Sequence, residues 1–151
     1  MKKVIVVFDN FGPYHIARLA AASKRVSLLA IEIRKYSREY GWKPTDDVTF
    51  RRMTLEGDGQ QNVLDQLQTI ICSEDLAAIA VPGWSGPYAF NLANAGLRNS
   101  VPLIVMSESQ QIDFARRRFS EFIKARYLKI FSAGLVGGKS HREYLVNLGM
   151  D

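Results

Sequence analysis

The feature that most constrains this chain is a regular alternation of short apolar runs with longer stretches of helical spacing. Val4–Phe8 is a continuous run of β-branched and aromatic residues, which is typical of a strand buried on both faces. Pro13–Ser23 then has the pattern of a helix. The same succession predicts further strands at Val26–Ile33, Val48–Met53, Leu76–Val81, Pro102–Met106 and Ile130–Val136, and further helices at Gln60–Cys72, Ser85–Asn99, Gln110–Lys129 and Lys139–Leu148.

Strands that alternate with helices pack as parallel βαβ units, with right-handed crossovers and helices on both faces of the sheet. We therefore predict an α/β fold: a single doubly wound, Rossmann-like domain over residues 1–151, with a mostly parallel sheet of about six strands. A chain of 151 residues is long enough for one such domain with its own core. Residues 34–47 form the one long irregular insert, and long loops in compact domains are often functional.

The composition excludes several classes of protein. One cysteine, Cys72, allows no disulfide or cysteine metal site within one chain, and we expect neither a metal nor a bound cofactor. The apolar run after the first three residues is too short for a secretory signal, so we expect a cytoplasmic location. A net charge of +5 permits a nucleic acid, an anionic membrane or a phosphorylated substrate as partner. No nucleic-acid recognition motif is present, and we expect no such partner.

Two loops mark the place where a ligand site is expected. Open α/β sheets bind ligands at the carboxyl ends of their strands, near the point where the strand order reverses. With the common order 3-2-1-4-5, this point lies between the first and fourth strands. The first of these strands runs into "DNFGPYH", and the fourth runs into "PGWSGPY". We expect these two loops to line one crevice.

The first loop places a glycine, a proline and a histidine where a helix begins. Gly12 allows a tight turn and close backbone approach, and Pro13 suits the first helical position. Tyr14 and His15 follow, and the positive end of the helix dipole disfavours a charged imidazole at His15. A neutral histidine there can act as a base or a hydrogen-bond partner, so we take His15 as the candidate catalytic residue. The alternative is a capped histidine without chemistry.

The second loop carries a tryptophan between two glycines. Trp84, followed by Ser85 and Gly86, can form a platform on which a sugar or another ring stacks. It can also be an apolar plug over the edge of the sheet, which the spacing favours, and both interpretations remain open. In both cases Trp84 and Ser85 are predicted to face the crevice.

The segment "SESQQIDFAR" follows the fifth predicted strand. Ser107 and Gln110 have the spacing of a capping box, and Ser109 is a second candidate cap. Asp113 and Arg116 are three residues apart, so they can pair on the surface of a helix. A structural cap with an ion pair explains this pattern. The functional interpretation is that the start of this helix also points into the crevice.

The segment "AGLVGGKS" ends like a phosphate-binding loop. Ala133 stands where that motif requires its first glycine, so a nucleoside triphosphatase is not predicted. Gly137, Gly138 and Lys139, at the start of the last helix, can still bind an anion.

The helix "ARRRFSEFIKARYLKIF" is rich in cations. We expect its outer side to carry Arg117, Arg118, Lys124 and Lys129, and its inner stripe to consist of Ile112, Phe119, Phe122 and Ile123. Such an outer side is usually a solvated face. The alternative is contact with an anionic membrane surface.

Several segments, taken in order, resemble one family. They are "GPYHIAR", "LLAIEI" with "SREYGW", "AVPGWSGPYAF", "PLIVMSESQQIDFARR", "EFIKARYLKIF" and "LVGGKSHREYLVNLGM". Together they resemble the N-terminal half of bacterial family 4 glycosyltransferases, which have the GT-B fold, over nearly the whole chain. In this family two Rossmann-like domains face each other across a cleft. The N-terminal domain mainly carries the acceptor, and the C-terminal domain mainly binds the nucleotide sugar.

The resemblance implies the acceptor-side half of an enzyme that transfers a sugar from a nucleotide diphosphate donor to a glycan, lipid-linked or small-molecule acceptor. It places the turn of Gly12–His15 toward sugar and acceptor, Trp84–Gly86 along the cleft, and Ser109, Asp113 and Arg116 at its floor. The donor-binding domain, on the same or a separate chain, is the implied partner, and we expect the isolated chain to be inactive. A homo-oligomer is a further expectation. The alternative function is a non-catalytic binding module on the same scaffold.

Overall fold

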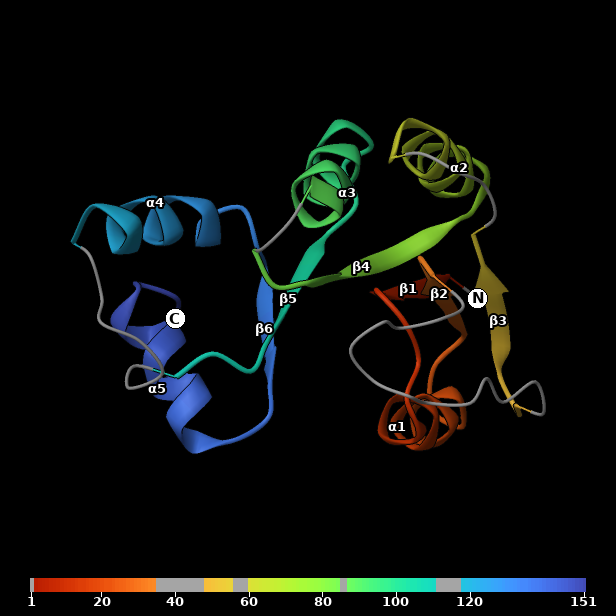
Figure 1. Ribbon diagram of the computed structural model, residues 1–151, viewed down its shortest axis with the longest axis horizontal. Coiled ribbons are helices and arrows are strands. Elements are labelled where there is room, and N and C mark those ends of the chain that lie inside the picture. Colours follow the sequence, from red (N-terminus) through yellow and green to blue (C-terminus); the bar gives the residue numbers. More distant parts are fainter. Residues whose placement is uncertain (1, 35–47, 56–59, 85–86, 111–117) are drawn as a thin grey trace. The chain divides into compact units, whose positions relative to one another are not determined.

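The computed structural model describes residues 2–34, 48–55, 60–84, 87–110 and 118–151 (Figure 1). Its strands form an all-parallel, six-stranded sheet in the order β3-β2-β1-β4-β5-β6, which confirms the predicted doubly wound α/β fold. The chain divides into two compact units, Met1–Ile79 and Ala80–Asp151. Strand β4 (Leu76–Pro82) runs from the first unit into the second.

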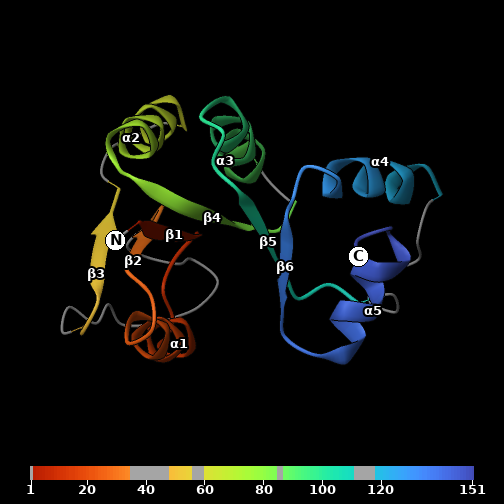
Figure 2. The same ribbon diagram turned by 180° about the vertical axis from the view of Figure 1, so that it is seen from behind.

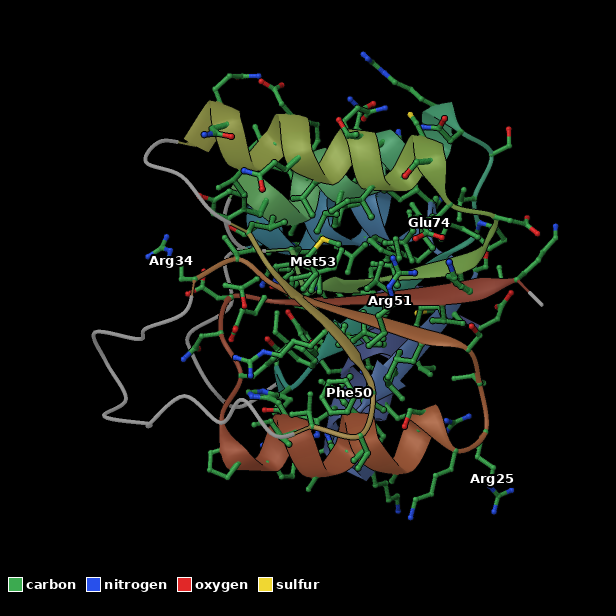
Figure 3. The ribbon with its side chains drawn as sticks, turned by 90° about the vertical axis from the view of Figure 1, so that its right-hand side faces the viewer. Arg25, Arg34, Phe50, Arg51, Met53 and Glu74 are labelled. Atoms are coloured by element: carbon green, nitrogen blue, oxygen red, sulfur yellow. The ribbon has the colours of Figure 1, made fainter. Side chains whose placement is uncertain are left out.

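Among its described residues, the first unit contains three complete strands, the first part of β4 and two helices. The elements are β1 (Lys3–Phe8), α1 (Pro13–Ser23), β2 (Leu28–Glu32), β3 (Arg51–Thr54) and α2 (Gln60–Ser73). Helices α1 and α2 lie on opposite faces of these strands (Figures 1 and 3). Covered on both faces, β2 is buried along its whole length, which explains its uninterrupted apolar sequence.

The core of the first unit on the α1 side is a cluster of buried apolar residues. Its members are Phe11, Leu19, Leu28, Ala30 and Phe50. Figure 3 shows Phe50 between β3 and α1, whereas Met53 lies on the α2 side of the same strand. The predicted third strand, Val48–Met53, is in fact β3 at Arg51–Thr54. Its first residues instead form the connection that brings Phe50 into this cluster.

Where the structure describes it, the second unit contains the end of β4, two further strands and three helices. These are α3 (Pro87–Arg98), β5 (Leu103–Ser107), α4 (Arg118–Leu128), β6 (Ala133–Val136) and α5 (Lys139–Asn147). Strands β5 and β6 pair in parallel, from Ile104 opposite Ala133 to Ser107 opposite Val136. Figure 2 shows α4 and α5 as neighbours, and side chains of the two helices contact each other directly. The predicted strand at Ile130–Val136 begins only at Ala133, because the residues before it form turns.

The orientation of α4 corrects the expected inner stripe. Phe119, Phe122 and Ile123 were predicted to face inward, yet their exposed fractions are 74%, 58% and 51%. Lys124 was predicted on the outer side, and instead it points inward to α5. The physical reason is that the inward side of α4 is polar but satisfied by hydrogen bonds, which hydrophobic periodicity cannot detect. Ile112 and Arg117 lie outside the described residues.

Candidate functional site

The turn between β1 and α1 contains the candidate catalytic histidine. Gly12 is the N-terminal cap of α1, and the backbone N–H of Ile16 donates to its carbonyl at 3.1 Å as the first bond of the helix. Gly12 has φ −90° and ψ 171°, an extended conformation open to any residue. Pro13 occupies the first helical position, as predicted. The turn therefore depends on the cap and the proline more than on the freedom of glycine.

His15 caps this helix with its imidazole ring. The Gly12 backbone N–H donates to Nδ1 of His15 at 3.1 Å, and the ring lies 4.4 Å from the Phe8 ring, centroid to centroid. An Nδ1 that accepts a hydrogen bond carries no proton, so a neutral ring in this position has its proton on Nε2. The half-buried His15 therefore has one nitrogen held by the backbone and an N–H at the other. It can donate a hydrogen bond to an oxygen that gains negative charge.

Tyr14 lies at the surface beside this histidine. Its side chain is 53% exposed, and the guanidinium carbon of Arg18 lies 4.2 Å from the centroid of its ring. The Tyr14 and His15 rings meet edge to face, with 5.9 Å between their centroids. An exposed aromatic ring with a cation on it is suited to contact a sugar or another polar ring.

A buried carboxylate under this turn was missed by the sequence analysis. Glu32, at the end of β2, is 1% exposed. Its Oε2 accepts a hydrogen bond from the backbone N–H of Phe11 at 3.0 Å. Its Oε1 accepts from Nε of Arg52 at 3.2 Å, from Nη2 of the same guanidinium, and from Oγ1 of Thr54 at 2.8 Å. A buried carboxylate requires such partners.

The strand register explains how these groups meet. Phe8 lies opposite Glu32 in the β1–β2 pair, and Glu32 lies opposite Thr54 in the β2–β3 pair. Arg52, two residues before Thr54, therefore points to the same face of β3. Its guanidinium also lies 5.4 Å from the centroid of the Phe11 ring. This cluster fastens the start of the β1–α1 turn to two neighbouring strands. The signal that could have revealed it is the single acid within the apolar run "LLAIEI".

Trp84, in the second unit, belongs to a polar network between α4 and α5. The Trp84 and Tyr144 rings pack edge to face with 6.1 Å between their centroids, and Nζ of Lys124 lies 5.6 Å from the Trp84 centroid. Lys124 donates to Glu121 at 2.9 Å and to the Tyr144 hydroxyl at 3.0 Å. That hydroxyl donates to Oε2 of Glu121 at 2.8 Å. Part of the half-buried Trp84 indole therefore packs against Tyr144 and Lys124.

The pKa values in this network favour one protonation state. Burial by itself would lower the pKa of Lys124, but its hydrogen bonds with Tyr144 and Glu121 raise it above the ordinary 10.5. Burial raises the pKa of Tyr144 above 10.0, with Lys124 acting against this and Glu121 reinforcing it. A charged lysine and a neutral tyrosine therefore persist at neutral pH. This state holds α4 against α5.

Ser109 is the described residue of the segment that follows β5 among the predicted site residues. Ser109 is half-buried, and its backbone N–H donates to Oγ of Ser107 at 3.2 Å, which is the hydrogen bond of a serine turn. Ser85, Gly86, Asp113 and Arg116 lie outside the described residues. Their proposed positions along the cleft remain predictions.

The start of α5 contains the predicted anion-binding residues. Gly138 is the N-terminal cap, without a side-chain hydrogen bond to the first amides, and no acidic residue occupies the first turn. Lys139 is exposed, and its Nζ lies 3.8 Å from Oε1 of Glu143. A side chain at Gly137 would come within 3.3 Å of Nδ1 of His141, which explains the glycine. That nitrogen is buried and has no hydrogen-bond partner within the described part of the chain.

The candidate residues are thus divided between the two units. Gly12, Pro13, Tyr14 and His15 belong to the first unit, and Trp84, Ser109, Gly137, Gly138 and Lys139 belong to the second. Among the described residues, no group of three or more His, Cys, Asp or Glu side chains could hold a metal ion. Within the same residues, every helix is too short or too polar to cross a bilayer.

Comparison with known proteins gives matches at the level of structure. No protein-family model matches the chain. A search of curated proteins gives no match either. A UDP-N-acetylglucosamine 2-epimerase from Rickettsia bellii has a TM-score of 0.59 and 16% identity, and the match covers 100% of this chain and 43% of the epimerase. Another solved UDP-N-acetylglucosamine 2-epimerase has a TM-score of 0.63 and 14% identity, and the match covers 99% of this chain and 46% of that epimerase.

A third match is the epimerase from Neisseria meningitidis, solved with UDP-GlcNAc bound. Its TM-score is 0.58 at 11% identity, and the match covers 99% of this chain and 43% of that one. At such low identity these similarities show the Rossmann-like fold alone. The chain spans less than half the length of each of these three epimerases.

Proposed function

We propose that this chain is one Rossmann-like half of a two-domain enzyme that acts on nucleotide sugars, and that it is the acceptor-side half of a glycosyltransferase. The observation that carries the proposal is the extent of the structural match. The match covers 99–100% of this chain and 43–46% of the length of enzymes whose names include a nucleotide sugar, as expected for one half of such an enzyme. The segments that resemble family 4 glycosyltransferases support the finer assignment.

The β1–α1 turn supplies the chemistry in this proposal. His15 lies at the carboxyl end of β1, where open α/β sheets bind ligands, and its Nδ1 accepts the Gly12 N–H. Its hydrogen bond from Gly12 fixes the ring, and the Glu32 cluster fixes the turn through Phe11. A positioned imidazole N–H can stabilise charge on a sugar or phosphate oxygen during transfer. Tyr14 provides an adjacent aromatic surface for the acceptor.

The second half of the enzyme supplies the donor site. We propose that a donor-binding domain, on the same or a separate chain, holds the nucleotide diphosphate sugar as substrate. Trp84–Gly86, Ser109, Asp113 and Arg116 then line the cleft on this side. Gly137, Gly138 and Lys139 contribute backbone N–H groups and a cation for an anionic group. No metal or bound cofactor is part of the proposal, and the enzyme acts in the cytoplasm.

A second candidate is half of a nucleotide-sugar epimerase. The observation in its favour is that the solved structures reported above are named as UDP-N-acetylglucosamine 2-epimerases. A non-catalytic module remains the alternative outside enzymology. The three differ in what the assembled protein makes: a glycosylated acceptor, the C2 epimer of the nucleotide sugar, or nothing.

The test begins with the isolated chain. Calorimetry against UDP-GlcNAc, UDP-glucose and GDP-mannose should give no measurable binding, because the donor half is missing. The chain is then joined to its donor-binding half, and the products are separated by chromatography. Transfer to an added acceptor supports a glycosyltransferase. Epimerisation without acceptor supports the second candidate, and tight binding of a nucleotide sugar by the monomeric isolated chain refutes the division into halves.

A further inference from the structure

The outward side of α4 is apolar and unusually exposed. We define the outer face of α4 as Arg118, Phe119, Phe122, Ile123 and Arg126, all of which are exposed. Its three apolar members are 74%, 58% and 51% exposed. Residues spaced by three and four along a helix lie on one side of it, so the two phenylalanines and the isoleucine form one patch. A cluster of this kind marks an interaction surface more often than isolated apolar residues do.

The opposite side of α4 shows why the helix does not turn this patch inward. Glu121 and Lys124 bond to each other and to Tyr144, which is fully buried on α5. Leu128 is buried on the same side. Rotating the helix would break these bonds and would bury Arg118 or Arg126 without partners, which is costly. The exposed patch is thus a consequence of stable packing.

All charges on the outer face are positive. The one acid of α4, Glu121, is used inward, while Arg118 and Arg126 flank the aromatic rings and Lys129 follows the helix. The guanidinium of Arg126 lies 5.3 Å from the centroid of the Phe122 ring. Among the described residues, no carboxylate lies within ion-pair distance of these three cations. The face therefore lacks counter-charges of its own.

We propose that the outer face of α4 docks this chain on an anionic lipid bilayer. Phenylalanine and isoleucine side chains enter the boundary between headgroups and acyl chains, and arginines reach the lipid phosphates along their apolar stems. A second copy of the chain is a poorer occupant. A two-fold interface on this face would bring its arginines close to one another without an acid to pair with. This inference is independent of the proposed enzymatic function.

The proposal is tested by flotation of the 151-residue chain with vesicles. Vesicles of phosphatidylcholine alone are compared with vesicles that contain about one third phosphatidylglycerol, at about 0.1 M and about 0.5 M NaCl. We expect binding to the anionic vesicles that weakens with salt, and little binding to the neutral ones. Arg118→Gln with Arg126→Gln should lower the partition coefficient about fivefold for each charge removed. Phe119→Ser with Phe122→Ser should lower it by at least about tenfold.

Matched controls separate this face from the general charge of the chain. Lys24→Gln with Arg25→Gln removes two exposed cations from the first unit, and Val26→Ser removes an exposed apolar side chain there. Neither should change binding by more than about twofold. Circular dichroism checks that each variant is folded. The proposal is overturned by absence of binding to anionic vesicles, by equal loss in the control pair, or by a dimer that the phenylalanine variants dissociate without any vesicle binding.

Discussion

The buried pair of Arg52 and Glu32 allows a sharp test of how the β1–α1 turn is held. Arg52→Met keeps most of the length of a side chain whose exposed fraction is 11%, and it removes the guanidinium. Among the described residues, the Glu32 carboxylate, 1% exposed, then retains the Phe11 N–H and the Thr54 hydroxyl as its donors. Removing one partner of a buried ion pair costs about 3–5 kcal/mol, because the other charge stays desolvated. We expect a loss of this size in the free energy of unfolding.

Arg51→Met is the matched control. Arg51 is the neighbouring residue of β3, yet its side chain is 52% exposed and pairs with Glu74 at 3.0 Å near the surface (Figure 3). Exposed ion pairs contribute about 0–1 kcal/mol, so this variant should differ little from the parent protein. Comparing the same substitution at two adjacent residues therefore separates the effect of burial on the free energy of unfolding from any effect of the local sequence.

The assay is urea unfolding followed by circular dichroism. With an m-value of about 2 kcal/mol per M, Arg52→Met should lower the midpoint by about 1.5–2.5 M, and Arg51→Met by less than about 0.5 M. Adding Glu32→Leu to Arg52→Met removes the stranded charge and should recover much of the loss. Equal shifts for Arg51→Met and Arg52→Met, or no recovery in the double variant, would refute this account of the cluster.

Three further predictions concern other parts of the chain. Gly83 has φ +65°, so Gly83→Ala should cost about 1–2 kcal/mol in urea unfolding, and an unchanged midpoint would contradict this. His15→Ala should cost only about 1 kcal/mol of stability, the worth of one cap. In the complete enzyme, His15→Ala should lower turnover about 10²–10⁴-fold if His15 moves a proton. If the variant instead unfolds while the remaining folded enzyme turns over normally, the role of His15 is structural. Burial raises the pKa of Tyr127 to about 12, so the unfolded chain loses this proton first and stability should fall as the pH rises from about 10 to 12. The free energy of unfolding of Tyr127→Phe should fall less over that pH range. An identical fall in the variant and the parent protein would exclude the effect.

The sequence by itself determined the class of fold and the placement of its elements. Strands β2 and β4 are apolar runs that are buried along most or all of their length, and burial on both faces leaves a local pattern that needs no knowledge of partners. The start of α1 could also be predicted from the local sequence, because Pro13 at the first helical position and His15 at the third stabilise the turn to which they belong. The weaker run at Val48–Met53 placed its strand only approximately.

Only the tertiary structure decided which polar groups are inside. Glu32 meets Arg52 and Thr54, which are 20 and 22 residues away in the chain, through the register of β2 and β3, and no spacing in the sequence encodes that pairing. Helix α4 is the clearest case, since apolar periodicity assigns its phenylalanines to the core. The side of α4 that is buried is instead the polar one, because Glu121 and Lys124 find complementary partners on α5. Whether a charged side chain can be buried depends on the groups that surround it in space, and those come from distant parts of the chain.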